Sequence, residues 1–137
     1  MLKRFGISLA VASVLVGGLI FATKQFLKPM NTNLSVVGQG LPALVFAYEN
    51  YSPESGAVLN QLNRIKSDYE NRMVFAVADL GTPEGRAFAQ RYELANGLAI
   101  LLSATGQPLG VAVLMSEETA LRKQLDAKLT LADTSRR

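Results

Sequence analysis

The chain has 137 residues, is 49% hydrophobic and carries a formal charge of +3, with neither cysteine nor histidine. That length accommodates one domain plus an anchor or tail, and the missing side chains exclude dithiol redox chemistry and the usual zinc ligand sets. Four of the 14 basic residues precede residue 29, whereas all 11 acidic residues follow it, so the rest of the chain has a formal charge of −1. We therefore expect no nucleic acid, metal ion or cofactor as a partner.

The N-terminal segment, residues 1–28, is predicted to be a membrane anchor. Its uncharged run from Phe5 to Ala22 would span about 27 Å as a helix, close to the thickness of the hydrocarbon core of a bilayer. The alternative is a cleaved secretory signal, because Lys3 and Arg4 precede the apolar run as they do in such signals. Cleavage after Ala12, however, would leave much of the run exposed on the mature chain.

The orientation of this anchor follows from the charges at its two ends. Lys24 and Lys28 oppose the basic residues and the amino group at the N-terminus, which leaves a slight preference for an N-terminus on the inside. Together with the signal-like character of the run, this predicts a single-pass protein of the bacterial inner membrane. The lipid bilayer would be crossed by residues 5–22, and the C-terminal domain would lie in the periplasm.

Residues 29–40 are predicted to be a polar linker broken by proline, within which Leu34 to Val37 forms a short strand. The domain follows over residues 41–129. Its apolar patterns predict four strands, at Leu41–Tyr48, Met73–Leu80, Leu98–Ser103 and Leu109–Leu114. A helix is predicted at Ser52–Tyr69, between the first two strands, a second from Thr82 on, before the third strand, and a third from Ser116 on, after the fourth.

Within this order, Met73–Leu80 is expected to be a central strand and the last two strands an antiparallel hairpin. Ser52 and Thr82 are each followed by a proline, which predicts a helix cap with proline at the first helical position. Residues 130–137 are expected to form a flexible tail.

Two stretches of the chain resemble the thioredoxin family. Residues 45–55 are similar to the segment in which a strand leads through two tryptophans into Cys-Gly-Pro-Cys, with tyrosines at the tryptophan positions and Ser52 and Ser55 at the cysteine positions. Residues 92–102, Tyr-Glu-Leu-Ala-Asn-Gly-Leu-Ala-Ile-Leu-Leu, are similar to the family's Tyr-Gly-Ile-Arg-Gly-Ile-Pro-Thr-Leu-Leu-Leu. The resemblance covers residues 41–129 and implies a three-layer, thioredoxin-like α/β domain with a mixed sheet.

The departures from the family are concentrated where its chemistry takes place. Besides the replaced cysteines, Pro53 stands one place earlier than the proline of the family motif. Leu98 occupies the position of the family's cis-proline, and we expect a trans peptide bond there because a cis bond before another residue costs about 2.5–4 kcal/mol. Phe46 occupies the place of the buried aspartate. The resemblance therefore implies a redox-inactive member of the family.

The resemblance also implies where a binding groove would lie, between the former active-site loop and the loop before Leu98. The candidate groove residues are Tyr48, Tyr51, Ser52, Pro53, Glu54, Ser55, Gly97 and Leu98. The alternative is that the tyrosines are merely a core residue and a lone surface aromatic. The two serines could be nucleophiles only with an adjacent general base, and without histidine we expect helix capping instead.

We expect no enzymatic activity. The predicted function is that of a redox-inactive, membrane-tethered binding or scaffold protein of the bacterial envelope, which holds an envelope or membrane protein partner and aids assembly or stability of a complex. One alternative is a thiol-independent enzyme or accessory factor derived from a thiol-disulfide oxidoreductase. Another is a structural subunit whose main interface is the anchor itself.

Overall fold

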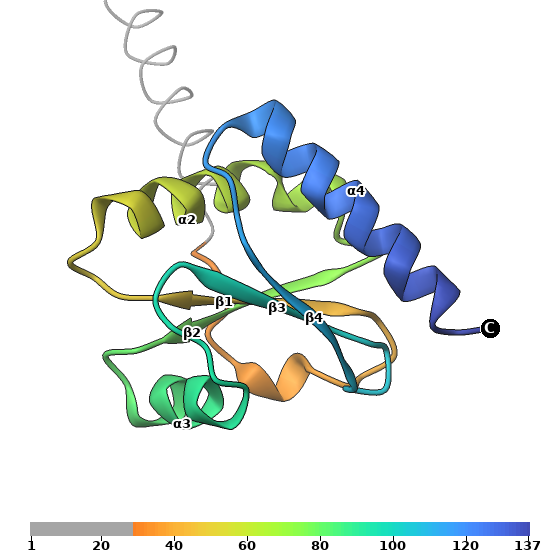
Figure 1. Ribbon diagram of the computed structural model, residues 1–137, viewed down its shortest axis with the longest axis horizontal. Coiled ribbons are helices and arrows are strands. Elements are labelled where there is room, and N and C mark those ends of the chain that lie inside the picture. The colour runs from red at the N-terminus through yellow and green to blue at the C-terminus, as the bar shows by residue number, and fades with distance from the viewer. Residues whose placement is uncertain (1–28) are drawn as a thin grey trace, which may run out of the picture.

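A computed structural model of the chain describes residues 29–137 (Figure 1). The predicted membrane anchor at residues 5–22 lies outside this range. Within residues 29–137, none of the helices combines the length and apolar character needed to cross a bilayer.

The described residues form four strands and three α-helices with two short 3₁₀ helices. In chain order these are η1 (Leu34–Val36), β1 (Ala43–Tyr48), α2 (Pro53–Ile65), η2 (Lys66–Asp68), β2 (Val74–Asp79), α3 (Pro83–Arg91), β3 (Leu98–Leu102), β4 (Pro108–Val113) and α4 (Glu118–Thr134). Helices α2 and α4 cover one face of the sheet, whereas α3 and η1 lie on the other (Figure 1). The domain thus has three layers, as predicted.

The sheet has the strand order β2-β1-β3-β4 and is mixed. Strand β1 pairs with β2 in parallel and with β3 antiparallel, and β3 and β4 form the predicted antiparallel hairpin. The expectation that Met73–Leu80 is a central strand is wrong, because β2 lies at an edge of the described sheet. No further strand in residues 29–137 pairs with it, and Val77 instead donates its N–H to the carbonyl of Asn31 at 2.8 Å.

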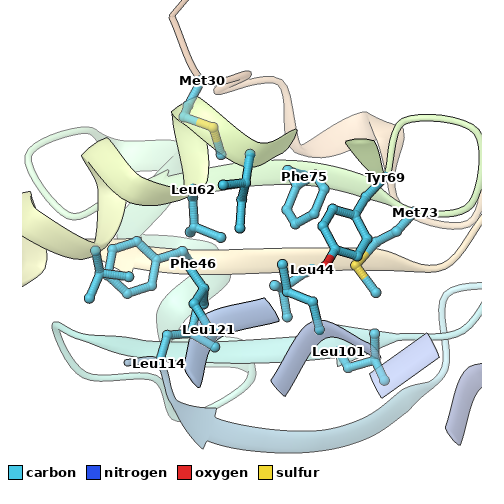
Figure 2. Packing of buried hydrophobic residues seen from close by; sticks show 14 of the residues in the cluster. Met30, Leu44, Phe46, Leu62, Tyr69, Met73, Phe75, Leu101, Leu114 and Leu121 are labelled. Carbon is cyan, nitrogen blue, oxygen red and sulfur yellow. The ribbon is translucent and has the colours of Figure 1, made fainter. Parts of the chain in front are cut away.

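The larger core lies between the sheet and the helices α2 and α4 (Figure 2). Strand β1 contributes Leu44 and Phe46 to it, each only 1% exposed. The helices contribute residues spaced three or four apart, as one face of a helix requires, and these are Val58, Leu62 and Ile65 from α2 and Leu121, Leu125 and Leu129 from α4. Burial of these side chains on one face fixes both helices against the sheet.

The opposite face is built from smaller side chains. Ala43, Val45 and Ala47 of β1 point to this side, where they meet residues of α3 and η1. Helix α3 approaches the sheet so closely that a Cβ atom built on Gly85 would lie 1.9 Å from the carbonyl oxygen of Asp79. Glycine is therefore required at this position of α3.

Both predicted helix caps are present. The Ser52 Oγ accepts from the N–H of Ser55 at 3.3 Å, and the Thr82 Oγ1 accepts from the N–H of Gly85 at 3.1 Å. In each case proline occupies the first turn. The strand-to-helix junctions are therefore determined by local sequence, which satisfies N–H groups that the helix leaves without partners.

Two predicted boundaries are wrong. Leu34–Val37 is not a strand, because the Asn33 side chain accepts from the N–H and the hydroxyl of Ser35 and turns the chain into η1. The expected flexible tail at residues 130–137 instead begins as the last turns of α4, which continues to Thr134. It does so because Ala132 is buried against the domain at 1% exposure.

Candidate functional site

The candidate site lies at the N-terminal end of α2, directly after β1. Ser52 caps the helix, and its hydroxyl also lies 3.3 Å from Oε2 of Glu54 in the first turn. Glu54 is exposed and places a negative charge at the positive end of the helix dipole, which stabilises the helix. Pro53, also exposed, has no N–H to satisfy at this position. These three residues therefore have a complete structural explanation.

Ser55 is different, because it is buried at 3% exposure and its hydroxyl contacts a second loop. Its Oγ donates to Oδ1 of Asn96 at 2.8 Å, and the N–H of Glu49 donates to the same oxygen at 2.9 Å. One side-chain carbonyl therefore joins the end of β1, the first turn of α2 and the loop before β3. Sequence reasoning missed Asn96, although the Asn-Gly pair it forms with Gly97 is a recognised turn signal.

The loop that contains Gly97 and Leu98 closes over the end of β1. Gly97 donates its N–H to the carbonyl of Ala47 at 2.9 Å and has a φ of +89°, a conformation that favours glycine. Every peptide bond within residues 29–137 is trans, including the one before Leu98, as expected from the sequence. Leu98 is half-buried and packs against the core on the α3 side of the sheet.

The two tyrosines of the predicted groove lie in different surroundings. Tyr48 is half-buried against the core on the α2 side, and its hydroxyl donates to Oδ1 of Asn50 at 3.1 Å. Tyr51 is 88% exposed and lines a hollow of about 540 Å³. The other residues of this hollow are Glu49, Asn50, Asp79, Leu80, Gly81, Thr82 and Arg86. The structure thus joins Tyr51 to the loop after β2, a neighbour that the sequence analysis did not include in the groove.

The chemistry available to the two serines is limited. Ser55 donates to an amide oxygen, which is not a base, and Ser52 is engaged in capping. Phe46, at the position where the family would carry a buried carboxylate, is 1% exposed within the larger core. Neither serine has a histidine beside it, because the chain contains none, and the carboxylate nearest to the Ser52 hydroxyl is that of the exposed Glu54 at 3.3 Å. The arrangement can cap a helix and present a surface.

Comparison with known proteins gives a fold but no family. No protein-family model matches the chain, and no curated protein sequence matches it. Among solved structures it is similar to a thioredoxin from Thermus thermophilus, with a TM-score of 0.56 and 18% sequence identity. The alignment covers 77% of this chain and 87% of the thioredoxin.

The fold is thioredoxin-like. At this level of identity the similarity establishes the architecture alone, and the activity of the bacterial protein does not follow from it. The thioredoxin-like domain described here has the mixed sheet that the sequence predicted, and it carries serines at the N-terminal end of α2 in a chain without cysteine.

Proposed function

We propose that the protein is a redox-inactive, membrane-tethered binding or scaffold protein of the bacterial envelope. A thioredoxin-like domain would lie in the periplasm on the anchor formed by residues 5–22, and it would hold an envelope or membrane protein during assembly of a complex. We propose no enzymatic activity for it, and the absence of cysteine rules out the dithiol chemistry of thioredoxins in particular.

One observation carries this proposal, namely the contrast between Tyr51 and the two serines beside it. Tyr51 is 88% exposed at the end of the domain where the serines lie, although aromatic side chains are costly to leave in water. The hydroxyls of Ser52 and Ser55 are at the same time engaged in bonds within the domain. A surface that retains an exposed aromatic residue beside engaged hydroxyls is suited to binding rather than to chemistry.

Site-specific crosslinking tests the proposal. A photoreactive amino acid in place of Tyr51 should capture one specific envelope protein in living cells. The matched control is Ala127, an exposed position on α4 far along the chain from the site. Equal capture from both positions, or capture only from Ala127, would show that this surface is not the interface.

Two further measurements separate the alternatives. An insulin-reduction assay serves only as a negative control, because the chain has no cysteine; hydrolysis of ester and peptide substrates by the full chain tests for a thiol-independent enzyme. We expect no turnover, and hydrolysis that is lost in Ser52→Ala would overturn the assignment of a non-enzymatic role. Replacement of residues 1–28 by an unrelated membrane helix should preserve the binding function, measured as crosslinking of the partner from position 51. Loss of function in that chimera would indicate that the anchor itself is the main interface.

A further inference from the structure

The hollow beside Tyr51 lies at a particular point of the sheet topology. Strands β1 and β2 are adjacent and parallel, and their last residues, Tyr48 and Asp79, are register partners. The chain leaves β1 into α2 on one face of the sheet and leaves β2 into α3 on the other. Adjacent parallel strands whose connections diverge in this way leave a crevice outside their carboxyl ends, where open α/β sheets bind ligands.

The backbone around the hollow is already hydrogen-bonded, and this limits what it can bind. The N–H of Gly81 donates to Oδ1 of Asp79 at 2.8 Å, and that of Leu80 donates to the carbonyl of Tyr48 at 2.9 Å. Arg86 donates through one nitrogen to the carbonyl of Leu80 at 3.3 Å. The backbone N–H groups of Leu80 and Gly81 are therefore not available to an anionic ligand, and Arg86 alone offers further donors of positive charge.

Two carboxylates at the hollow keep acceptor oxygens without partners. In the described part of the chain the carboxylate of Glu49 takes part in no ion pair or hydrogen bond, and Asp79 uses only one of its two carboxylate oxygens. These two negative charges exceed the single positive charge of Arg86. No group of three or more acidic residues in the described range is placed to hold a metal ion. The ligand is therefore expected to be an organic cation.

The ring of Tyr51 completes this chemistry. An exposed aromatic face attracts a guanidinium or ammonium group, and arginine combines this contact with hydrogen bonds to carboxylates. We propose that the hollow binds an arginine-bearing or lysine-bearing extended segment of the partner protein, with the cationic side chain between Tyr51 and the carboxylates of Glu49 and Asp79. This inference rests on the proposed binding function and specifies the chemistry of the partner.

Peptide binding to the full-length chain in non-ionic detergent tests this inference. The probes are two five-residue peptides with blocked termini, Ser-Arg-Val-Arg-Ser and Ser-Gln-Val-Gln-Ser. Each carries the same uncharged fluorophore, and its binding is followed by fluorescence anisotropy. The arginine peptide should bind more tightly, and its affinity should fall as salt is raised because the attraction is between charges near the surface. Equal affinity for the two peptides would overturn the inference, as would spermidine competing as strongly as the arginine peptide.

Variants then locate the site. The affinity for the arginine peptide should fall about two- to fivefold in each of three variants, Glu49→Gln, Asp79→Asn and Tyr51→Ala. Tyr51→Phe, which keeps the aromatic ring, should bind the peptide as tightly as the original chain does. Asp133→Asn, which removes an exposed acid near the end of α4, is the control and should have no effect. Circular dichroism verifies that each variant is folded. An equal loss in Asp133→Asn would show that net charge, and not the hollow, attracts the peptide.

The outcome is separable from that of the proposed function. Specific crosslinking from Tyr51 with no preference for the arginine peptide would support the binding function and contradict the inference that the partner binds through a cationic segment. Preference for arginine with no crosslinking from Tyr51 would support the chemistry of the hollow and contradict the envelope partner.

Discussion

Gln124 of α4 hydrogen-bonds to Val113 of β4, with Nε2 donating to the Val113 carbonyl at 2.9 Å. Its Oε1 accepts from the N–H of Met115 at 2.8 Å, so the side-chain amide pairs with the strand edge as another strand would. Strand β4 is the last strand of the described sheet, and Val111, Val113 and Met115 are 49%, 65% and 50% exposed there. An uncharged, apolar edge of this kind favours pairing between molecules, and Gln124 occupies part of it.

We expect Gln124→Ala to lower the free energy of unfolding by about 1–2 kcal/mol, because two hydrogen bonds are lost. The variant should also self-associate more readily, since the Val113 carbonyl and the Met115 N–H become free to pair with another chain. Urea unfolding measures the first effect and analytical ultracentrifugation the second. Lys123→Ala, at the exposed neighbouring position, is the control. Unchanged stability and association in Gln124→Ala would contradict this role for the amide.

Two glycines in helices should respond to alanine in opposite directions. Gly85→Ala should destabilise the domain by about 3 kcal/mol or more, because the new methyl group would overlap the carbonyl of Asp79. Gly56→Ala in α2 should raise stability by about 0.5–1 kcal/mol, since a Cβ there meets nothing within 4 Å and alanine favours the helix. Thermal unfolding of both variants decides the matter, and a stable Gly85→Ala variant would show that α3 does not pack as described.

Asn96 should matter more to stability than the serine it contacts. Asn96→Ala removes the acceptor for both the buried Ser55 hydroxyl and the Glu49 N–H, and we expect a loss of about 1–3 kcal/mol. Ser55→Ala should cost less, because the Asn96 oxygen keeps its bond from Glu49. Chemical denaturation of both variants gives the comparison. The reverse order would mean that Asn96 does not organise the two loops.

Glu93 at the end of α3 has a φ of +55°, which is unusual for a residue with a side chain. Leu94 donates its N–H to Ala89 and Glu93 donates to Gln90, the pattern of a helix end that normally carries glycine. Glu93→Gly should therefore raise the free energy of unfolding by about 1 kcal/mol. Glu93→Ala, which removes the carboxylate and keeps a Cβ, should give no such gain. A gain in both variants would assign the effect to charge.

The cap of α4 predicts how stability depends on pH. Hydrogen bonds from the N–H groups of Thr119 and Ala120 hold the pKa of Glu117 below its ordinary value of 4.5. A depressed pKa in the folded state means that the stabilisation is complete above the unfolded pKa and is lost as the pH falls through the folded one. Unfolding measured between about pH 6 and pH 3 should show this loss, and Glu117→Gln should show a smaller one. Identical pH profiles for the original chain and Glu117→Gln would show that the Glu117 carboxylate does not stabilise the helix.

The sequence alone determined the local elements of this protein. The Ser-Pro and Thr-Pro pairs at residues 52 and 82 mark where helices begin, because a side-chain oxygen and a missing N–H both suit the first turn. The spacing of Leu121, Leu125 and Leu129 likewise fixed the buried face of α4. Dithiol chemistry is excluded by composition, because a chain without cysteine has no thiol to oxidise in any fold.

The tertiary structure decided what depends on residues far apart in the chain. An apolar strand such as β2 has the same pattern whether it is central or at an edge, because helices cover both faces in either case. Nothing local could show that Asn96 accepts from Ser55, 41 residues away, or that Tyr51 shares a hollow with the loop after β2. These contacts arise only when parallel strands bring their ends together, which is why the sequence identified the candidate site but not its neighbours.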